Sequence, residues 1–427
     1  MTSVSVDRTE ESCSEPGGPP KKRQGEIPSF HENGSAEGAL ECRGLTPPSP
    51  PGLRAGGNLR RRQAAALQGA SRRNLLLLAL LLPLAGFLAC QGYDSTKTTP
   101  QIPPGGVLLQ GAGATFPSLL YKQWFAIYHK EHPKTVITYD AVGSGEGIRR
   151  FLGKNVEDSE QVDFGASDAA MQDSEIAQIP DGVVMLPATA GGVALAYNLP
   201  DVQGDLKLSR RAYVGIFLGE IKNWNDPLIA ASNPGLKLPK LTIATVVRRD
   251  ASGTTFAFTK HLDAISDQWR ARYGPSTLVD WPGNAMRAKG NEGVAGVLQH
   301  SVGAIGYVGS EFAVKYGLQT ALLENKSGKY VKATEDSLRA ALASVELPQN
   351  LRAYIPDPAT PDAYPIATFT WILLRKNYID AQKAKSIRDL FSWALVEGQQ
   401  YSSPLGYVPL PPGVVDKAQG ALKTITP

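Results

Sequence analysis

Four short loops contain the residue types that can bind an anion without a metal ion. They are residues 111–117 (GAGATFP), 142–147 (VGSGEG), 163–168 (DFGASD) and 248–255 (RRDASGTT), and each follows or ends a run typical of a strand. Where such a loop opens a helix, free N–H groups point outward at the positive end of the helix dipole. Together the loops offer these amides, several hydroxyls, arginine and one acid, which predicts an enclosed oxyanion site.

The first loop places Thr115 and Phe116 directly before Pro117, a residue suited to the first turn of a helix. The loop lacks the third glycine of a dinucleotide-binding fingerprint, and no Gly-Lys-Ser/Thr follows as in a P-loop. A glycine-rich turn that binds nothing is the alternative interpretation of this loop alone.

Ser144 and Asp168 each have a structural alternative. Ser144 stands where a helix begins, so its hydroxyl can cap that helix as well as donate to an anion. It is not in a Gly-x-Ser-x-Gly pattern, which argues against a nucleophile. Asp168 ends a strand, where an aspartate commonly caps the helix that follows.

The fourth loop supplies Arg248, whose paired donors suit a tetrahedral oxyanion. Asp250 is placed to hold that arginine in position. Ser252, Gly253 and Thr254 add hydroxyls and backbone amides. The alternative is a surface ion pair followed by a serine helix cap.

The composition excludes several classes of protein. The chain has 427 residues, 44 Lys+Arg and 40 Asp+Glu, a net charge of +4 that does not indicate a nucleic-acid binder. Three cysteines and five histidines are too few for a disulfide scaffold or a His-rich metal protein. We expect no cofactor and no metal. The length predicts two or three domains with sizeable cores.

The first ninety residues differ from the rest. Residues 1–90 hold 11 Lys+Arg and 8 Asp+Glu, which leaves 33 and 32 for the remainder, and all three cysteines fall in this part. Residues 1–60 contain 9 Gly and 8 Pro, a composition typical of disorder. We expect residues 1–70 to be a disordered or mis-annotated N-terminal extension.

Residues 71–90 resemble an export signal. Arg72 and Arg73 precede a fifteen-residue apolar run (LLLLALLLPLAGFLA), which is shorter than the roughly 20 residues of a membrane span. Cys90 follows it, as in a lipoprotein cleavage box, so we expect lipidation at Cys90. An ordinary secretory signal with an incidental cysteine is the alternative. Residues 91–104 have the composition of a tether.

Beyond the tether, apolar strand-like runs alternate with helical patterns, which predicts an α/β fold with open sheets. Helices are expected over residues 117–132 and from residue 148. Strands are expected over residues 107–110, 135–139, 162–167, 183–186, 192–198, 241–247, 304–308 and 368–374.

The four loops, in this order and spacing, resemble the phosphate-binding protein of the high-affinity ABC phosphate importer (PstS family). The segments 187–198 (PATAGGVALAYN), 216–239, 289–308 and 391–394 (FSWA) resemble the family as well, so that the similarity runs from about residue 107 to about residue 415. The resemblance implies a type II periplasmic-binding-protein fold, in which two α/β lobes joined by two crossing strands close over the ligand.

By that resemblance, lobe I comprises residues 105–192 plus 366–427, and lobe II comprises residues 193–365. The resemblance implies that phosphate is bound by Thr115, Phe116, Ser144 and Asp168 from one lobe and by Arg248, Ser252, Gly253 and Thr254 from the other, with Asp250 supporting the arginine.

Two positions depart from the family pattern. Ala251 stands where the family usually has glycine, and Glu146 stands where family members commonly have a small residue. A carboxylate facing the anion would weaken binding, so we expect Glu146 to point to solvent.

Asp168 suggests how the site selects its anion. Phosphate near neutral pH keeps a P–OH that can donate to a carboxylate, whereas sulfate has no proton and would leave two acceptors facing each other. Selectivity for phosphate over sulfate is therefore expected to depend on Asp168.

The resemblance implies a binding protein, not an enzyme, that delivers inorganic phosphate to ABC permease subunits with a cytoplasmic ATPase. We expect a monomer that is exported to the periplasm or the outer face of the cytoplasmic membrane and meets the membrane through its lipid anchor. Three alternatives remain: a binder of sulfate or molybdate, a phosphatase with Ser144 or Thr254 as nucleophile, and a phosphate sensor without a permease.

Overall fold

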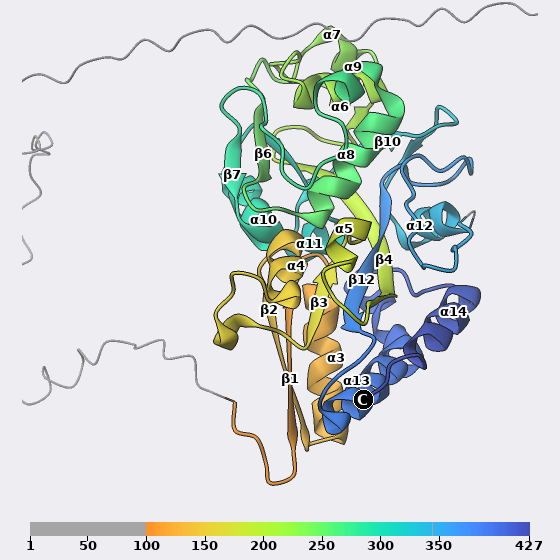
Figure 1. The fold of residues 1–427 in the computed structure, drawn as a ribbon. Coiled ribbons are helices and arrows are strands. Elements are labelled where there is room, and N and C mark those ends of the chain that lie inside the picture. The colour runs from red at the N-terminus through yellow and green to blue at the C-terminus, as the bar shows by residue number, and fades with distance from the viewer. Residues whose placement is uncertain (1–99, 344) are drawn as a thin grey trace, which may run out of the picture. The chain divides into compact units, whose positions relative to one another are not determined.

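The computed structural model describes residues 100–343 and 345–427, which belong to one compact unit that spans residues 96–427. The expectations for residues 1–70, for the export signal with Cys90, and for most of the tether lie outside the described residues. The described chain is mixed α/β, with two lobes built on one long curled sheet (Figure 1).

The sheet has nine strands in the order β2-β1-β3-β12-β4-β8-β6-β7, with β9 paired to β4. The first lobe holds β1 (Val107–Gly113), β2 (Thr135–Ala141) and β3 (Phe164–Ser167). All three run parallel, with Leu109 opposite Ile137 and Gly113 opposite Ala166. Their carboxyl ends therefore meet at one edge, where ligands of open α/β sheets bind.

The second lobe has its own parallel strands, β6 (Ala244–Arg248), β7 (Met286–Ala288) and β8 (Ala304–Gly309). β6 lies between the other two and is parallel to both. A separate three-stranded sheet is formed by β5 (Lys207–Leu208), β10 (Leu322–Glu324) and β11 (Tyr330–Val331), and β9 is Gln319–Thr320.

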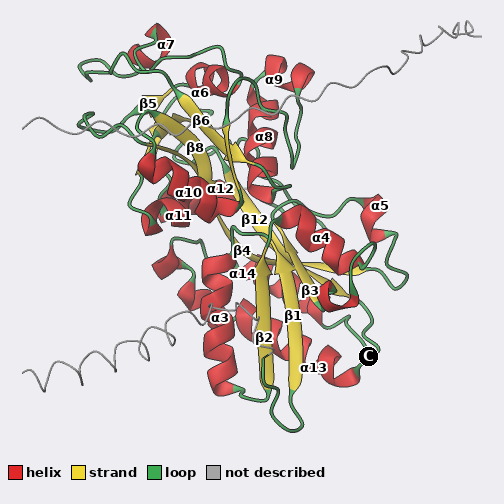
Figure 2. Ribbon diagram, turned by 90° about the vertical axis from the view of Figure 1, so that its left-hand side faces the viewer, coloured by secondary structure: helices red, strands yellow, loops and turns green. Residues whose placement is uncertain are grey.

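Two long strands connect the lobes. β4 (Val183–Tyr197) and β12 (Ala367–Arg375) are antiparallel to each other and pass through the middle of the molecule (Figure 2). β12 pairs with β3 on its other side, and the upper end of β4 pairs with β8. Because fourteen of the fifteen β4 residues are buried, this strand is an apolar run without alternation, as expected for a strand covered on both faces.

The helices cover both sheets. In the first lobe they are α3 (Ser118–Glu131), α4 (Ser144–Leu152), α5 (Asp173–Ile176), α13 (Ala381–Leu395) and α14 (Pro412–Leu422). The others are α6 (Arg210–Phe217), α7 (Pro227–Ala230), α8 (Gly253–Ile265), α9 (Asp267–Arg272), α10 (Gly290–His300), α11 (Ser310–Lys315) and α12 (Glu335–Leu342). Short 3₁₀ helices occupy Asp158–Glu160, Glu397–Tyr401 and Ser403–Leu405.

The alternating pattern was correctly interpreted as α/β, but one element was wrong. The two strands expected over 183–186 and 192–198 are a single strand, β4. Thr370 lies opposite Thr189 and Trp371 lies opposite Pro187, so Ala188 is an extra residue in a bulge that accommodates the proline. Tertiary pairing with β12 on one side thus carries the strand through residues that usually break one.

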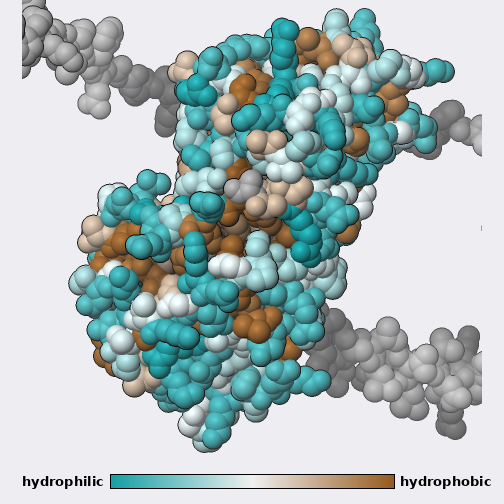
Figure 3. Space-filling view, turned by 90° about the vertical axis from the view of Figure 1, so that its right-hand side faces the viewer, coloured by the Kyte–Doolittle hydropathy of each residue, from teal (hydrophilic) through white to brown (hydrophobic). Residues whose placement is uncertain are grey.

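Several element boundaries also differ from the expected ones, and two elements begin three or four residues away from the expected start. α4 begins at Ser144, four residues before the expected start, and β6 begins at Ala244, three residues after the expected start. Within the described residues, no helix is long and apolar enough to cross a bilayer. Figure 3 shows one face of the two lobes, on which apolar side chains form small patches among polar ones.

Candidate anion-binding site

The four loops singled out from the sequence meet between the lobes. The loops after β1, β2 and β3 come from the first lobe, and the loop after β6 comes from the second. Every side chain in them that is expected to bind the anion is almost completely buried. The exposed fractions are 6% for Thr115, 0% for Phe116, 1% for Ser144, 1% for Asp168, 1% for Arg248, 0% for Ser252 and 0% for Thr254.

Ser144 joins the two lobes through its hydroxyl. Its Oγ accepts a hydrogen bond from the backbone N–H of Gly253 at 3.0 Å and another from that of Asp168 at 3.3 Å. Gly143 is the N-cap of α4, and no side chain caps this helix. The capping role considered for Ser144 is therefore wrong, and its hydroxyl faces the other candidate residues instead.

Gly253 must lack a side chain because the lobes approach closely here. A Cβ at this position would lie 2.5 Å from the Cβ of Asp168 and 2.7 Å from its Cα. Nearby, the N–H of Gly145 donates to the carbonyl of Ala251 at 3.0 Å. The methyl group of Ala251, which departs from the family glycine, faces Gly145, where a Cβ would lie at 2.5 Å. The absence of a side chain at Gly145 accommodates this substitution.

Asp168 is held by hydroxyls from two different elements. Thr370 on β12 donates to its Oδ1 at 2.8 Å, and the Thr254 hydroxyl lies 3.5 Å from its Oδ2. Burial raises the pKa of Asp168 to about 7, against the opposing effects of the Thr370 hydrogen bond, the Arg248 charge and Thr254. The helix that follows, α5, is capped by Gln172, so the capping role considered for Asp168 is also wrong.

Arg248 forms a buried ion pair with Asp250. Its Nε donates to Oδ1 of Asp250 at 2.9 Å, and a second nitrogen donates to Oδ2. The remaining nitrogen points at the Thr254 hydroxyl, 3.5 Å away. This pair is not on the surface, since the Arg248 side chain is 1% and the Asp250 side chain 14% exposed.

Asp250 holds more than the arginine. The backbone N–H of Gly290, at the start of α10, donates to its Oδ1 at 3.0 Å. Burial alone would raise the pKa of Asp250, but the hydrogen bonds and charge of Arg248 outweigh burial, so the pKa is lowered. Asp250 is consequently ionised at neutral pH and fixes Arg248 with one guanidinium edge turned toward Thr254.

Asn291 links the two lobes and was not a candidate from the sequence. Its amide nitrogen donates to the Thr115 hydroxyl at 2.9 Å and to the Thr254 hydroxyl at 3.2 Å, while its backbone N–H donates to Thr115 at 3.1 Å. Its Oδ1 accepts from the N–H of Gly309 at 3.0 Å. One completely buried amide therefore sets the positions of two candidate hydroxyls.

Phe116 and Ser252 have clear structural roles. The Phe116 carbonyl accepts from the Tyr407 hydroxyl at 2.6 Å, and the two rings pack edge to face. Ser252 is the N-cap of α8, with its Oγ accepting from the N–H of Thr255 at 3.2 Å. The serine cap considered from the sequence is confirmed for Ser252, and it begins the helix whose first residues, Gly253 and Thr254, face Asp168.

Glu146 does not belong to the buried cluster. Its carboxylate accepts from Arg149 at 2.7 Å and from Arg150 at 2.9 Å, and its side chain is 31% exposed. The hydrogen bond from Arg149 is the main reason why its pKa is lowered to about 2. Glu146 thus lies outside the buried cluster, as expected, but it is only partly exposed and pairs with two arginines of its own helix instead of simply pointing to solvent.

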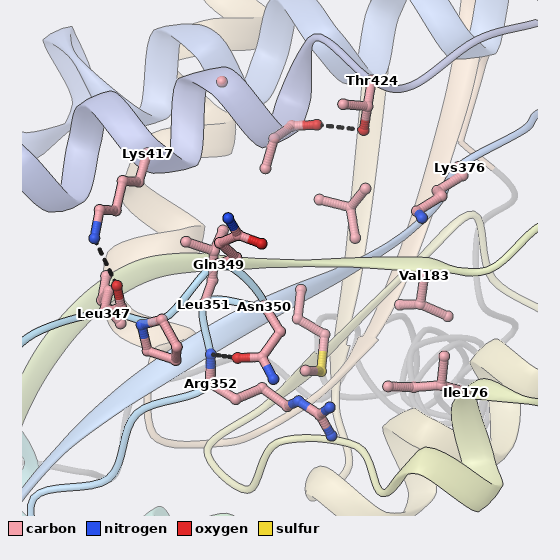
Figure 4. A pocket seen from close by; sticks show the side chains of 15 residues that line it. Ile176, Val183, Leu347, Gln349, Asn350, Leu351, Arg352, Lys376, Lys417 and Thr424 are labelled. Atoms are coloured by element: carbon pink, nitrogen blue, oxygen red, sulfur yellow. Dashed lines mark hydrogen bonds between the residues drawn. The ribbon is translucent and has the colours of Figure 1, made fainter. Parts of the chain in front are cut away.

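A separate pocket of about 770 Å³ lies beside α14, away from the four loops (Figure 4). Its walls include Val183, Leu351 and Lys376, and the Lys417 ammonium donates to the Leu347 carbonyl at 2.6 Å. None of the candidate residues lines it. In the described part of the chain, no group of three or more His, Cys, Asp or Glu side chains is placed to hold a metal ion.

Sequence reasoning missed Asn291, Thr370 and Tyr307, whose hydroxyl accepts from the N–H of Arg248 at 3.2 Å. Asn291 follows Gly290 after a strand, a signal like that of the four loops. Thr370 and Tyr307 lie inside strands, and only strand pairing shows what they face.

Solved structures share this fold. The chain matches a high-affinity periplasmic phosphate-binding protein, PfluDING, solved with phosphate, with a TM-score of 0.62 at 22% identity over 74% of this chain and 93% of that one. It also matches a phosphate ABC transporter substrate-binding protein from Clostridium perfringens, solved with phosphate, with a TM-score of 0.51 at 15% identity over 71% of this chain and all of that one.

Sequence comparisons are more specific. The family model of the PBP superfamily domain matches residues 91–395. The phosphate-binding protein PstS of Xylella fastidiosa (strain 9a5c) is 36% identical over 331 residues, 76% of this chain and 88% of its own length. PstS of Methanocaldococcus jannaschii is 34% identical over 376 residues, 82% of this chain and 95% of its own length. The buried interlobe cluster therefore lies in a chain that belongs to the PstS family of phosphate-binding proteins.

Proposed function

We propose that this protein captures inorganic phosphate between its lobes and delivers it to an ABC permease driven by a cytoplasmic ATPase. The observation that carries the proposal is the buried set of donors that both lobes contribute around Asp168. The first lobe binds the phosphate through Thr115, Phe116, Ser144 and Asp168. The second lobe binds it through Arg248, Ser252, Gly253 and Thr254. The names of the relatives support phosphate as the ligand.

The charges of the cluster suit an oxyanion that carries its own proton. Arg248 is largely neutralised by Asp250, which is 2.9 Å away, so backbone amides and hydroxyls must supply most of the stabilisation. The pKa of Asp168, raised to about 7 by burial, places this carboxyl close to the range in which phosphate itself titrates. Asp168 and phosphate can therefore share one proton, which lies between them as a hydrogen bond.

That shared proton accounts for selectivity. A fully ionised anion such as sulfate brings no proton, so an ionised Asp168 would face it as a second acceptor in a buried site. Leaving buried polar groups unpaired costs about 1–3 kcal/mol, and more when they are charged. A site built on such pairing discriminates by up to about 10⁴-fold. Sulfate or molybdate binding is the alternative that this arrangement disfavours.

We also propose that the site is not catalytic. The hydroxyl of Ser144, the first nucleophile considered, accepts from two backbone amides, at 3.0 and 3.3 Å. The second, Thr254, lies 3.5 Å from Asp168 and beside the Arg248 guanidinium. Neither arrangement provides the close general base that phosphoryl transfer to a hydroxyl needs. A phosphatase assay with p-nitrophenyl phosphate is expected to show no turnover.

The lobe boundaries and the location follow from the same assignment. We place lobe I at residues 105–192 plus 366–427 and lobe II at 193–365, with β4 and β12 as the connections about which the lobes close.

We further propose export through the signal at residues 71–90 and membrane attachment by a lipid on Cys90 through the tether 91–104, with the protein acting as a monomer. Loss of membrane attachment in a Cys90→Ser variant would support the anchor, and unchanged attachment would refute it.

Titration of the purified protein with phosphate, followed by intrinsic tryptophan emission and by calorimetry, tests the proposed function. Saturable one-site binding at micromolar phosphate, with sulfate binding far more weakly, is expected. Absence of phosphate binding, or preference for sulfate or molybdate, would overturn the assignment. A permease-dependent uptake assay in membrane vesicles separates transport from sensing.

A further inference from the structure

Glu311 is a second buried carboxyl close to the proposed phosphate site. It lies in α11 directly after β8 and is 1% exposed. Among the described residues, neither of its carboxyl oxygens has a hydrogen-bond partner. Buried carboxylates are normally paired or hydrogen-bonded, because an isolated charge is strongly disfavoured away from water. This side chain therefore stands apart from Asp168 and Asp250, which both have partners.

Segments from both lobes enclose Glu311. Its carboxyl packs against Gly309 so closely that a Cβ on that glycine would collide with it. Gly406 of the C-terminal segment also approaches this residue, and a Cβ there would lie 3.3 Å from the Cα of Glu311 and 3.4 Å from its Cβ. Gly309 belongs to lobe II and Gly406 to lobe I as assigned above. The burial of Glu311 thus depends partly on the contact between the lobes.

The neighbouring groups offer no compensating charge. Burial raises the pKa of Glu311 well above its usual range, and the negative charge of Asp168 raises it further; the dipole of its own backbone N–H, which makes no hydrogen bond to the carboxyl, opposes this only partly. The Tyr407 hydroxyl, another titratable group nearby, donates to the Phe116 carbonyl. On α11 itself, Lys315 is paired at 3.0 Å with the exposed Glu292 of α10.

Glu311 is also connected to the proposed site through the backbone. Gly309, against which its carboxyl packs, donates its N–H to Asn291, whose amide bonds both Thr115 and Thr254. A charge on Glu311 would therefore destabilise the contact between the two lobes around the anion.

We propose that Glu311 is a proton-binding residue coupled to lobe closure: it is neutral when the lobes are closed and ionises when they open. This inference rests on the proposed phosphate-driven closure. Closing on phosphate then takes up one proton at Glu311, in addition to any exchanged by Asp168 and the phosphate. Ionisation favours the open form, so raising the pH promotes release of the anion.

The sign follows from linkage. Above the ordinary pKa of glutamate, Glu311 has lost its proton in the open form but retains it in the closed form. In that range closure weakens as pH rises, by about tenfold in affinity per pH unit for one proton. Glu311→Gln keeps the size and the neutral state and removes this contribution. Asp168 and the phosphate titrate in both proteins, so the difference in proton uptake between wild type and Glu311→Gln reports on Glu311 and its charge interaction with Asp168.

The test is phosphate binding by calorimetry from about pH 6 to about pH 8 in buffers of different ionisation enthalpy, which gives the protons taken up per phosphate. Wild type is expected to take up about one proton more than Glu311→Gln, with the variant binding more tightly at the upper pH. Glu292→Gln, an exposed carboxyl on the neighbouring helix, is the matched control and should behave as wild type.

Equal proton uptake in wild type and Glu311→Gln, with phosphate bound by both, would overturn this inference and leave the proposed function intact. Absence of phosphate binding in wild type would instead overturn the proposed function. If Glu311→Gln does not fold, Glu311→Met replaces it, since an apolar side chain of similar length suits a buried site without partners. Glu311→Met is expected to take up the same number of protons per phosphate as predicted for Glu311→Gln.

Discussion

The Thr370 hydroxyl donates a 2.8 Å hydrogen bond to Oδ1 of Asp168, and both side chains are buried. The strands place the two residues together: β12 runs antiparallel to β3, with Trp371 opposite Ser167. One oxygen of Asp168 is thereby occupied. Its other oxygen, Oδ2, is the one that faces Thr254 and the first turn of α8 in the opposite lobe.

Replacing Thr370 with valine should weaken phosphate binding and reduce its preference over sulfate. The hydroxyl lowers the pKa of Asp168 and fixes the orientation of the carboxyl, so its loss makes Asp168 easier to protonate and freer to rotate. A hydrogen bond to a charged group contributes about 1.5–3 kcal/mol, or roughly tenfold to a hundredfold in affinity. Calorimetry with both anions at about pH 8 measures the effect.

Thr368→Val is the control for Thr370→Val. Thr368 lies on the same strand and is equally buried, but its hydroxyl bonds the Phe369 carbonyl instead of the site. Similar affinity losses in both variants would mean that Thr370 acts only through the stability of β12.

Selectivity should depend on pH in a direction set by Asp168. Its pKa of about 7 means that the carboxyl is increasingly neutral at lower pH and can then donate a proton to sulfate. The penalty against sulfate falls accordingly, so the ratio of sulfate to phosphate Kd should fall by up to about tenfold per pH unit below 7. Competition titrations at about pH 8 and about pH 5.5 measure this ratio.

Asp168→Asn separates that effect from other titrations. Asparagine has an amide that donates at every pH, so the variant should bind sulfate relatively better and lose the part of the pH dependence that comes from Asp168, leaving only that of phosphate itself. A variant ratio that still follows the wild-type pH dependence would show that another group controls selectivity.

Removing the Asp250 charge should lower the stability of the protein, and bound phosphate should restore part of that stability. Asp250→Asn leaves Arg248, which is 1% exposed, without its charge partner. Breaking a buried ion pair from one side costs about 3–5 kcal/mol. A bound anion supplies the missing negative charge, so phosphate should raise the Tm of the variant by more than it raises that of wild type.

The comparison for Asp250→Asn is Asp357→Asn. Asp357 pairs with the partly buried Arg210 at 2.6 Å, away from the four loops. Its removal should lower the Tm without enlarging the phosphate effect. The measurement is thermal unfolding of wild type, Asp250→Asn and Asp357→Asn with and without phosphate. If phosphate raises the Tm of all three proteins equally, the prediction is wrong.

Asn291→Ala should lower phosphate affinity by about tenfold to a hundredfold, because two site hydroxyls lose their common donor. Asn325→Ala is a matched control, since Asn325 is also a buried, fully bonded amide but holds the carbonyls of Pro361 and Ala363 in lobe II. Calorimetry should show a loss of affinity only in the first variant. If Asn291→Ala and Asn325→Ala bind phosphate with equal affinity, Asn291 contributes only to packing.

The sequence by itself determined the α/β class, the family, and the four loops that come together. Glycines, hydroxyls and helix starts at the ends of apolar runs are local features, and residues such as Gly253 and Arg248 carry their chemistry in their own types and spacing. The same locality explains the success with Ser252, whose cap is formed by the next three residues.

Only the tertiary structure decided which partners these residues meet. Thr370 lies 202 positions from Asp168 and Asn291 lies 176 from Thr115, and nothing in the local pattern of a buried strand or helix start indicates such pairs. The continuity of β4 through Pro187 likewise depends on its pairing with β12. The raised pKa of Glu311 is decided in the same way, because burial is a property of what packs around a residue, and in this molecule both lobes contribute to it.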